Sequence, residues 1–410
     1  MYRDTQNPRN LKFLISIIVS TGLLGGTLRV NADPVVLSPA AQLGKKMFFD
    51  KNLSASGQMA CSSCHDPNFH YAPPNGLAVQ LGGPNLSAAG TRAVPTLTYK
   101  DFTTPYADLA DNPDGISAPG PGGGLTQDGR AATLADQAQI PLLAVNEMAN
   151  SSAADVVNKI KNSSYADLFV QAFGNVFASV DIAFADARSA LQAYQIEDPS
   201  FHPYSSKYDL YAGNKIGGAL TPAEARGLVV FSDENKGNCF ACHYSGAGQN
   251  GSVALFTDFS YEAIGVPRNN KDIPANHLVR GLPVSYDLGI CSRPDHLLPE
   301  NAQYCGMFKT PTLRNVATRQ VFFHNGQFKS LKDVIHFYST RDTNPELWYP
   351  AANGVVQKFD DLPITYRDNI DTQMPLDGRP AGSKPAMTDQ DMADLEAFLG
   401  TLTDGYQPPK

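Results

Sequence analysis

The feature that most constrains this 410-residue chain is a motif of two cysteines and a histidine that occurs twice. The two copies read CSSCH and CFACH and comprise Cys61, Cys64 and His65, and Cys239, Cys242 and His243. Each follows a related stretch, SPAAQLGKKMFFD at 38–50 and TPAEARGLVVFSD at 221–233, in which Ser or Thr, Pro, Gly, Phe and Asp share the same offsets. Ser or Thr before Pro is typical of a helix start. The chain therefore contains two copies of one predicted helical unit.

The Cys-x-x-Cys-His spacing is the attachment motif of a c-type haem, in which two thiols form thioethers with the vinyl groups and the adjacent histidine binds the iron. A zinc site would need a second pair of ligands near each motif, and a thioredoxin-like redox pair would need a βαβ context. Neither accompanies these motifs. We therefore predict two covalently bound c-type haems, with His65 and His243 as their proximal iron ligands.

Two cysteines, Cys291 and Cys305, lie outside the motifs. Exported proteins form and keep disulfides, so we predict that these two cysteines pair with each other. A loop of this size contributes roughly 3 kcal/mol of stability through chain entropy.

The first 32 residues predict export. Arg3, Arg9 and Lys12 precede the apolar run FLISIIVSTGLLGG, and VNA ending at Ala32 is a small-residue cleavage site. The run is too short to predict a membrane span, so we expect a periplasmic mature protein without one. Loss of this segment removes four positive charges and one negative charge, which changes the formal net charge from −8 to −11 and argues against a nucleic-acid partner.

The rest of the chain predicts a mainly α protein with long irregular loops. Apolar residues recur at helical spacing in 133–148, 152–174, 179–196, 330–340 and 387–402. Gly and Pro are concentrated in 111–130, and 197–209 is typical of a linker. We expect a signal peptide at 1–32, an N-terminal domain at 33–203, a C-terminal domain at 204–385, and a C-terminal helix and tail at 386–410.

Several segments carry a resemblance to a known family. LGKKMFFD, CSSCHDP, DGRAATLADQA, NEM, CFACH, FKTPTLRNV and FFHNG occur in this order, and the chain resembles the bacterial di-haem cytochrome c peroxidase and MauG family, most of all its MauG-like members. The match covers essentially all of the mature chain. The resemblance implies two cytochrome c-like helical domains, each with one haem. It also implies that the N-terminal haem reacts with peroxide and that the C-terminal haem transfers electrons.

The resemblance also implies catalytic residues beside the first haem. Counted from Gln127, the residue before DGR, the family's distal Gln and Glu fall on Gln137 and Glu147, and Pro141 matches a distal-pocket proline. Glu147 would move a proton from the near to the far oxygen of peroxide, and Gln137 would orient the peroxide.

Family members that need reductive activation carry a removable distal histidine sixteen positions beyond the first motif. Leu81 occupies that position here, and the nearby His70 is too close along the chain to reach the distal face. We therefore expect a five-coordinate first haem.

The second axial ligand of the C-terminal haem separates two branches of the family. In peroxidases that draw electrons from a small cytochrome it is a methionine, and in MauG it is a tyrosine. The resemblance places Tyr338 at this position, whereas His336 falls elsewhere on the helix. Met307 and Met374 remain alternative ligands.

The chain departs from the family pattern at two positions. Gln127 replaces a tryptophan that lies between the haems, and the only tryptophan is Trp348. Ala93 replaces an asparagine that binds an inter-haem calcium ion. Because the remaining calcium ligands of the family are carbonyl groups, which Arg319 and Val321 could still offer, the sequence leaves calcium binding open.

Together these features predict a periplasmic di-haem oxidoreductase that uses hydrogen peroxide. In the MauG-like reading, high-valent haem iron oxidises a secreted partner protein, with modification of tryptophan or another aromatic side chain. In a second reading the protein is a cytochrome c peroxidase that reduces peroxide to water with electrons from a small cytochrome c or cupredoxin. A third reading, a non-catalytic di-haem electron carrier, gives no role to Gln137 and Glu147.

Overall fold

The computed structural model describes residues 35–115, 117–246, 253–271, 286–293, 295 and 302–409. The predicted signal peptide lies outside the described residues. Residues Leu37–Lys410 form one compact unit.

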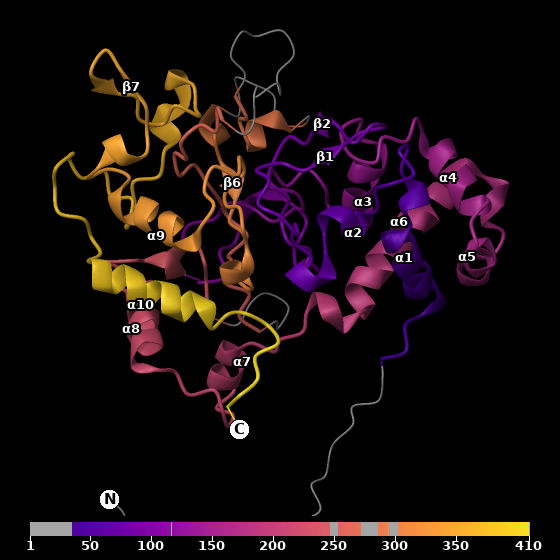
Figure 1. The fold of residues 1–410 in the computed structure, drawn as a ribbon, viewed down its shortest axis with the longest axis horizontal. Helices are drawn as coiled ribbons and strands as arrows, with labels where there is room; N and C mark the ends of the chain where they lie inside the picture. Colours follow the sequence, from indigo (N-terminus) through magenta and orange to yellow (C-terminus); the bar gives the residue numbers. More distant parts are fainter. Residues whose placement is uncertain are drawn as a thin grey trace, which may run out of the picture. The chain divides into compact units, whose positions relative to one another are not determined.

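This unit is mostly helical, as predicted, and long irregular connections join its helices (Figure 1). Its helices are α1 (Pro39–Phe49), α2 (Cys61–Cys64), α3 (Leu134–Leu143), α4 (Ala153–Lys161), α5 (Ala166–Phe173), α6 (Val180–Glu197), α7 (Lys207–Ala212), α8 (Pro222–Ser232), α9 (Leu331–Thr340) and α10 (Asp389–Gly400). Among the described residues, the strands pair in four short antiparallel ladders: β1 (Leu81–Gly82) with β2 (Ala88–Ala89), β3 (Ala107–Ala110) with β4 (Gly120–Gly122), β5 (Tyr261–Glu262) with β6 (Phe308–Lys309), and β7 (Ala351–Ala352) with β8 (Val355–Val356).

Helices α1, α8 and α10 begin where the sequence predicts, whereas α7 begins inside the predicted linker and the predicted run 152–174 forms two helices, α4 and α5. Ser38 caps α1 by accepting a hydrogen bond from the Ala41 amide at 3.1 Å, and Thr221 caps α8 in the same way. Thr388 and Asp391 form the predicted capping box at the start of α10. Each cap satisfies an amide that the first helical turn leaves without a partner.

The two repeated helices make the same kind of crossing. α1 packs against α6, and α8 packs against α10 (Figure 1). A Cβ atom added to Gly44 would lie 1.9 Å from the Ala190 carbonyl oxygen, and one added to Gly227 would lie 1.9 Å from the Asp394 carbonyl oxygen. Glycine is therefore required at both crossings, because only a bare backbone permits so close an approach.

Two large apolar clusters surround these crossings. The first is built from residues between Leu43 and Phe201, and the second from residues between Tyr208 and Leu402. In the first, the Phe48 and Tyr194 rings meet with centroids 5.5 Å apart. The limits of the two domains remain a prediction, because residues Leu37–Lys410 also form one compact unit.

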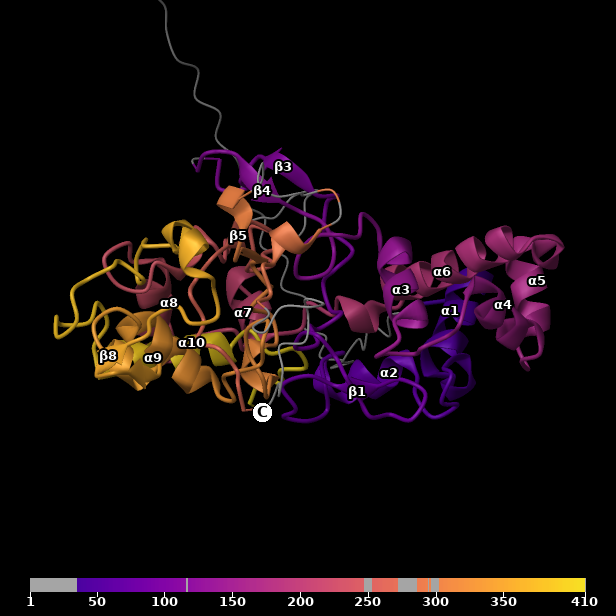
Figure 2. The same ribbon diagram turned by 90° about the horizontal axis from the view of Figure 1, so that it is seen from above.

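Short ladders and ion pairs join the N-terminal and C-terminal parts of this unit. Gly122 in β4 bridges to Ser260, next to β5, and Figure 2 shows β3, β4 and β5 close together. Arg92 binds Asp128 at 2.8 Å and Asp287 at 2.6 Å. These contacts bring the Gly- and Pro-rich loop against the C-terminal part of the chain.

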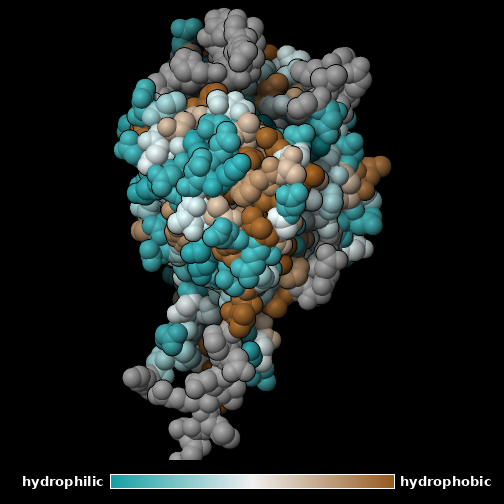
Figure 3. Space-filling view, turned by 90° about the vertical axis from the view of Figure 1, so that its right-hand side faces the viewer, coloured by the Kyte–Doolittle hydropathy of each residue, from teal (hydrophilic) through white to brown (hydrophobic). Residues whose placement is uncertain are grey.

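The predicted disulfide between Cys291 and Cys305 is confirmed. No helix in the described part of the chain has the length and apolar character to cross a membrane. The face that includes α4 and α5 carries apolar side chains interspersed with polar ones (Figure 3).

Candidate haem cavities and active site

Two cavities accompany the two Cys-x-x-Cys-His motifs. The first has a volume of about 1710 Å³ and the second a volume of about 1720 Å³. Both volumes include space that is open to solvent. Cys61, Cys64 and His65 line the first cavity. Cys239, Cys242 and His243 line the second.

The two histidines are held in the same manner. His65 Nδ1 lies 3.0 Å from the Tyr71 carbonyl oxygen, and His243 Nδ1 lies 3.1 Å from the Phe256 carbonyl oxygen. Because a carbonyl oxygen only accepts, Nδ1 must donate, and Nε2 keeps a free lone pair. Burial lowers the pKa of both histidines to about 4. Both rings are therefore neutral and able to bind a metal through Nε2.

The cysteines are poorly suited to zinc. Zinc binds thiolates in sets of four ligands. Within the described residues, no group of three or more His, Cys, Asp or Glu side chains could hold a metal ion.

The first cavity brings together the three residues that the resemblance places beside the peroxide-reactive haem. Gln137 and Pro141 belong to α3, Glu147 lies in the turn that follows, and all three line the cavity with His65. Burial raises the pKa of Glu147, while the charge of Arg130 opposes this shift. The cavity therefore contains a carboxyl group that can hold and release a proton above its ordinary pKa of 4.5.

The segment around Leu81 covers Glu147. The Gly83 amide donates to the Glu147 carbonyl oxygen at 2.8 Å, and a Cβ atom added to Gly82 would lie 2.8 Å from the Glu147 Cα. Leu81 itself lines the first cavity, whereas His70 lines neither cavity. The resemblance implies a removable histidine at position 81 in family members that need reductive activation. Here that position carries the aliphatic side chain of Leu81.

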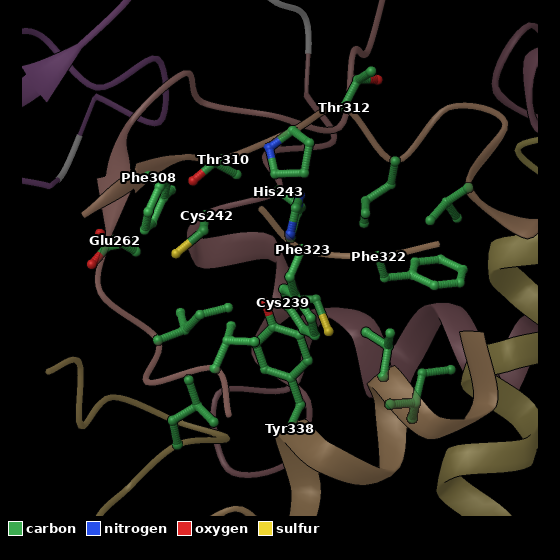
Figure 4. A pocket seen from close by; sticks show the side chains of 18 of the residues that line it. Cys239, Cys242, His243, Glu262, Phe308, Thr310, Thr312, Phe322, Phe323 and Tyr338 are labelled. Atoms are coloured by element: carbon green, nitrogen blue, oxygen red, sulfur yellow. The ribbon is translucent and has the colours of Figure 1, made fainter. Parts of the chain in front are cut away.

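Tyr338 lies in the second cavity with His243. Figure 4 shows the two side chains entering the cavity from opposite sides, with the Tyr338 ring directed from α9 toward His243. Ser330 is the N-cap of α9 and accepts a hydrogen bond from the Asp333 amide. The apolar stripe predicted for this helix is buried at Leu331, Val334 and Ile335. Burial raises the pKa of the Tyr338 phenol above its ordinary value, so the phenol is neutral until a metal ion displaces its proton.

The alternative ligands for the second haem iron differ in whether they reach the second cavity. Met374 also lines the second cavity, but Met307 does not. His336 lies outside the cavity, and its ring packs against Trp348 with centroids 5.2 Å apart. Met374 is therefore the methionine that competes with Tyr338.

Three positive side chains lie at the cavities and form no salt bridge with a carboxylate among the described residues. Lys100 and Lys309 line both cavities, and Arg319 lines the second. Burial lowers the pKa of Lys100 to about 8, with a contribution from Arg319, and lowers the pKa of Arg319 to about 10. Buried charges in proteins are normally paired. A haem carries two carboxylate groups, so these cations fit a haem in each cavity.

Gln127 lies between the two cavities and lines both of them. Its Nε2 donates to the Ala93 carbonyl oxygen at 2.7 Å, while its Oε1 is buried with no hydrogen-bond partner in the described part of the chain. A buried acceptor without a partner is consistent with a cavity in which a further polar group supplies the missing hydrogen bond.

The sequence did not single out Lys100, Lys309 or Glu262 as site residues. Glu262 lines the second cavity, and burial together with Asp371 and Asp258 raises its pKa to about 8. Lys100 begins a turn, and Glu262 and Lys309 lie in the two-residue strands β5 and β6, which are too short for a periodicity that marks a residue as buried. Only the approach of distant segments reveals these residues.

Comparisons with known proteins agree with these cavities. The family model described as di-haem cytochrome c peroxidase matches residues 38–216. Methylamine utilization protein MauG of Paracoccus denitrificans is 32% identical over 383 residues, which cover 90% of this chain and 89% of that protein. Cytochrome c551 peroxidase of Nitrosomonas europaea is 28% identical over 324 residues, which cover 77% of each chain.

A solved structure is also similar. The crystal structure of the diheme peroxidase BthA from Burkholderia thailandensis is 39% identical in sequence and superposes with a TM-score of 0.79, covering 91% of this chain and 88% of that one. On this evidence the chain belongs to the di-haem cytochrome c peroxidase family and is an oxidoreductase of the peroxidase type.

Proposed function

We propose that this chain is a MauG-like di-haem enzyme that uses hydrogen peroxide to oxidise a partner protein. The observation that supports this proposal best is the phenol of Tyr338, which enters the second cavity opposite His243. A phenolate ligand stabilises oxidised iron more strongly than a thioether does. The second site would then favour strong oxidation over simple electron uptake.

In this proposal, residues that line the two cavities hold the haems. His65 binds the iron of the first haem, and His243 and Tyr338 bind the iron of the second. Cys61 with Cys64, and Cys239 with Cys242, would form the thioethers. When bound, the haems supply iron that cleaves the O–O bond of peroxide and takes up its two oxidising equivalents.

The side chains of the first cavity handle the proton. Ionised Glu147 accepts the proton of the near peroxide oxygen and returns it to the far oxygen, which leaves as water. The amide of Gln137 orients the peroxide and stabilises the charge that develops. Burial raises the pKa of Glu147, which makes its carboxylate a better proton acceptor in the first transfer.

A second candidate function rests on Met374. Its side chain also lines the second cavity. If its sulfur bound the second iron, the site would suit a cytochrome c peroxidase that reduces peroxide to water with electrons from a small cytochrome c or cupredoxin. A plain electron carrier would need neither the acid-base pair of the first cavity nor an open iron.

The N-terminal sequence supports a periplasmic location, since residues 1–32 have the pattern of a cleavable signal peptide. The disulfide between Cys291 and Cys305 agrees with an oxidising compartment.

Electron paramagnetic resonance of the ferric holoenzyme tests the ligand assignment. We expect one high-spin and one low-spin haem. Tyr338→Phe and Tyr338→Met should change the low-spin signal and leave the high-spin signal nearly intact. His336→Phe on the same helix is the matched control and should alter neither. An unchanged low-spin signal in Tyr338→Phe, together with a changed one in Met374→Leu, would favour the second candidate function.

The substrate needs a separate measurement. Mass spectrometry of a secreted protein encoded next to this enzyme, before and after peroxide treatment with the holoenzyme, should reveal a peroxide-dependent mass change on an aromatic residue. Oxidation of a reduced small cytochrome with no covalent change in any such protein would indicate the plain peroxidase.

A further inference from the structure

Arg319 links two distant segments at the border of the cavities. Its guanidinium donates from Nη2 to the Val94 carbonyl oxygen at 3.0 Å and from Nε to the Val321 carbonyl oxygen at 3.3 Å. Close by, the Ala93 amide donates to the His324 carbonyl oxygen at 2.7 Å. We call this region, residues 92–94 and 319–324, the junction.

The family resemblance implies a calcium ion at the junction, but the oxygen atoms here do not suit one. Calcium takes six to eight oxygen ligands. Ala93 has no side-chain oxygen, and its carbonyl accepts from Gln127 Nε2 at 2.7 Å. The Val321 carbonyl, one of the two expected calcium ligands, already accepts from Arg319.

Electrostatics point the same way. The Arg319 guanidinium has no carboxylate partner among the described residues, and the charge of Lys100 acts on the same region. A divalent ion at the junction would also have to displace the Arg319 guanidinium from the Val321 carbonyl oxygen. A guanidinium, in contrast, is planar, always charged and able to donate to several carbonyl oxygens at once.

We propose that Arg319 takes the place of a calcium ion at the junction, so that this enzyme holds its two cavities together with a cation of its own and needs no metal ion there. The proposal connects the two departures from the family pattern. The amide of Gln127 occupies the Ala93 carbonyl, and the guanidinium of Arg319 occupies the carbonyls of Val94 and Val321.

Calcium analysis of the holoenzyme tests the proposal without reference to turnover. The protein is treated with EGTA and desalted, its calcium content is measured by elemental mass spectrometry, and its thermal unfolding and haem spectra are recorded before and after addition of millimolar calcium chloride. We expect far less than one calcium ion per chain and no shift in melting temperature or spectra. A calcium ion retained through desalting, or changes on chelation that calcium reverses, would overturn the proposal.

Substitution of Arg319 tests the role of its side chain. Arg319→Met should lower the melting temperature and shift the haem signals, because the carbonyls lose their donor, and Arg319→Lys should restore part of the loss. Arg367→Met is the matched control, since Arg367 also donates to a carbonyl oxygen, that of Leu362 at 3.2 Å, but lines neither cavity. Equal effects of Arg319→Met and Arg367→Met would contradict the proposal. If Arg319→Met does not fold, the calcium measurement on the unaltered protein decides alone.

Discussion

Glu147 shows how one residue acquires its chemistry from its surroundings. By residue type it is an ordinary carboxylic acid, and it lies in a turn. Its backbone is covered by Gly82 and Gly83, and its carboxyl group lines the first cavity with Gln137 and Pro141. Burial disfavours the ionised form and raises the pKa, as it does for many catalytic carboxyl groups.

Replacement of this carboxyl group is the first prediction at the residue scale. Glu147→Gln should slow peroxide cleavage by about 100-fold or more, the usual contribution of a positioned acid-base group, without loss of either haem. Since the ionised form accepts the first proton, the unaltered enzyme should lose rate as the pH falls through the raised pKa of Glu147, and the variant should lack this step. Stopped-flow absorption across pH measures both. Asp136→Asn, on α3 beside Gln137 but outside the cavity, is the control. An undiminished rate in Glu147→Gln would exclude the acid-base role.

Gln127 is the second prediction at this scale. An amide cannot be oxidised as an indole can, so Gln127→Trp should speed oxidation of a partner if the missing indole limits transfer between the haems. The same change removes the donor to the Ala93 carbonyl, so we expect a loss of roughly 1 to 3 kcal/mol in stability. Transient kinetics and thermal unfolding report the two effects separately. An unchanged oxidation rate in a folded variant would show that another route dominates.

At the scale of elements, the repeated helix crossing organises each half of the chain. Gly44 in α1 and Gly227 in α8 let the helices approach backbone to backbone, and aromatic pairs close the contacts. The offsets shared by the two sequence repeats therefore have a structural cause. The same positions meet the same neighbours in both halves.

The crossings give a prediction for these glycines. Gly44→Ala and Gly227→Ala should each destabilise the protein by about 1 to 3 kcal/mol or more, because the added methyl group would overlap a carbonyl oxygen of the facing helix. Gly400→Ala at the end of α10 is the matched control, since a Cβ atom there meets nothing within 4 Å. Its effect should be within about 1 kcal/mol of zero. Denaturant unfolding of the three variants provides the measurement, and similar stabilities for all three would refute the crossing argument.

At the scale of the whole molecule, the two cavities dominate the interior. Each is bordered by one apolar cluster, and side chains such as Phe231 and Leu399 in the second, or Phe48 and Leu191 in the first, line them directly. Protein interiors are close-packed, and apolar walls that face an unfilled space lose their contacts. Groups that fill the two cavities therefore stabilise the folded state as well as supplying chemistry.

The chain produced without haem attachment should reveal this dependence. Expressed in cells that lack cytochrome c maturation, it should retain helical far-ultraviolet circular dichroism but lose near-ultraviolet signals, and protease should digest it much faster than the holoenzyme. The holoenzyme from cells with the maturation system is the control. A sharp cooperative unfolding transition of the haem-free chain at the holoenzyme's temperature would count against the prediction.

Much of this arrangement could be predicted from the sequence, since it depends on neighbours along the chain. The helix caps, the apolar stripe of α9, the pairing of Cys291 with Cys305 and the two attachment motifs follow from local patterns, and the structure places the helices and the disulfide as expected. The resemblance of short motifs added Gln137, Glu147 and Tyr338, which line the cavities.

What the sequence alone determined, then, is most of the helices, the repeated unit and the residue types that can bind two haems. Only the tertiary structure decided which charges become buried and which carbonyls are already occupied. Lys100, Lys309 and Arg319 come from separate segments of the chain, and no local pattern marks their convergence on the cavities. The physical reason is that burial and hydrogen-bond competition depend on contacts between residues far apart in the chain, such as that of Arg319 with Val94.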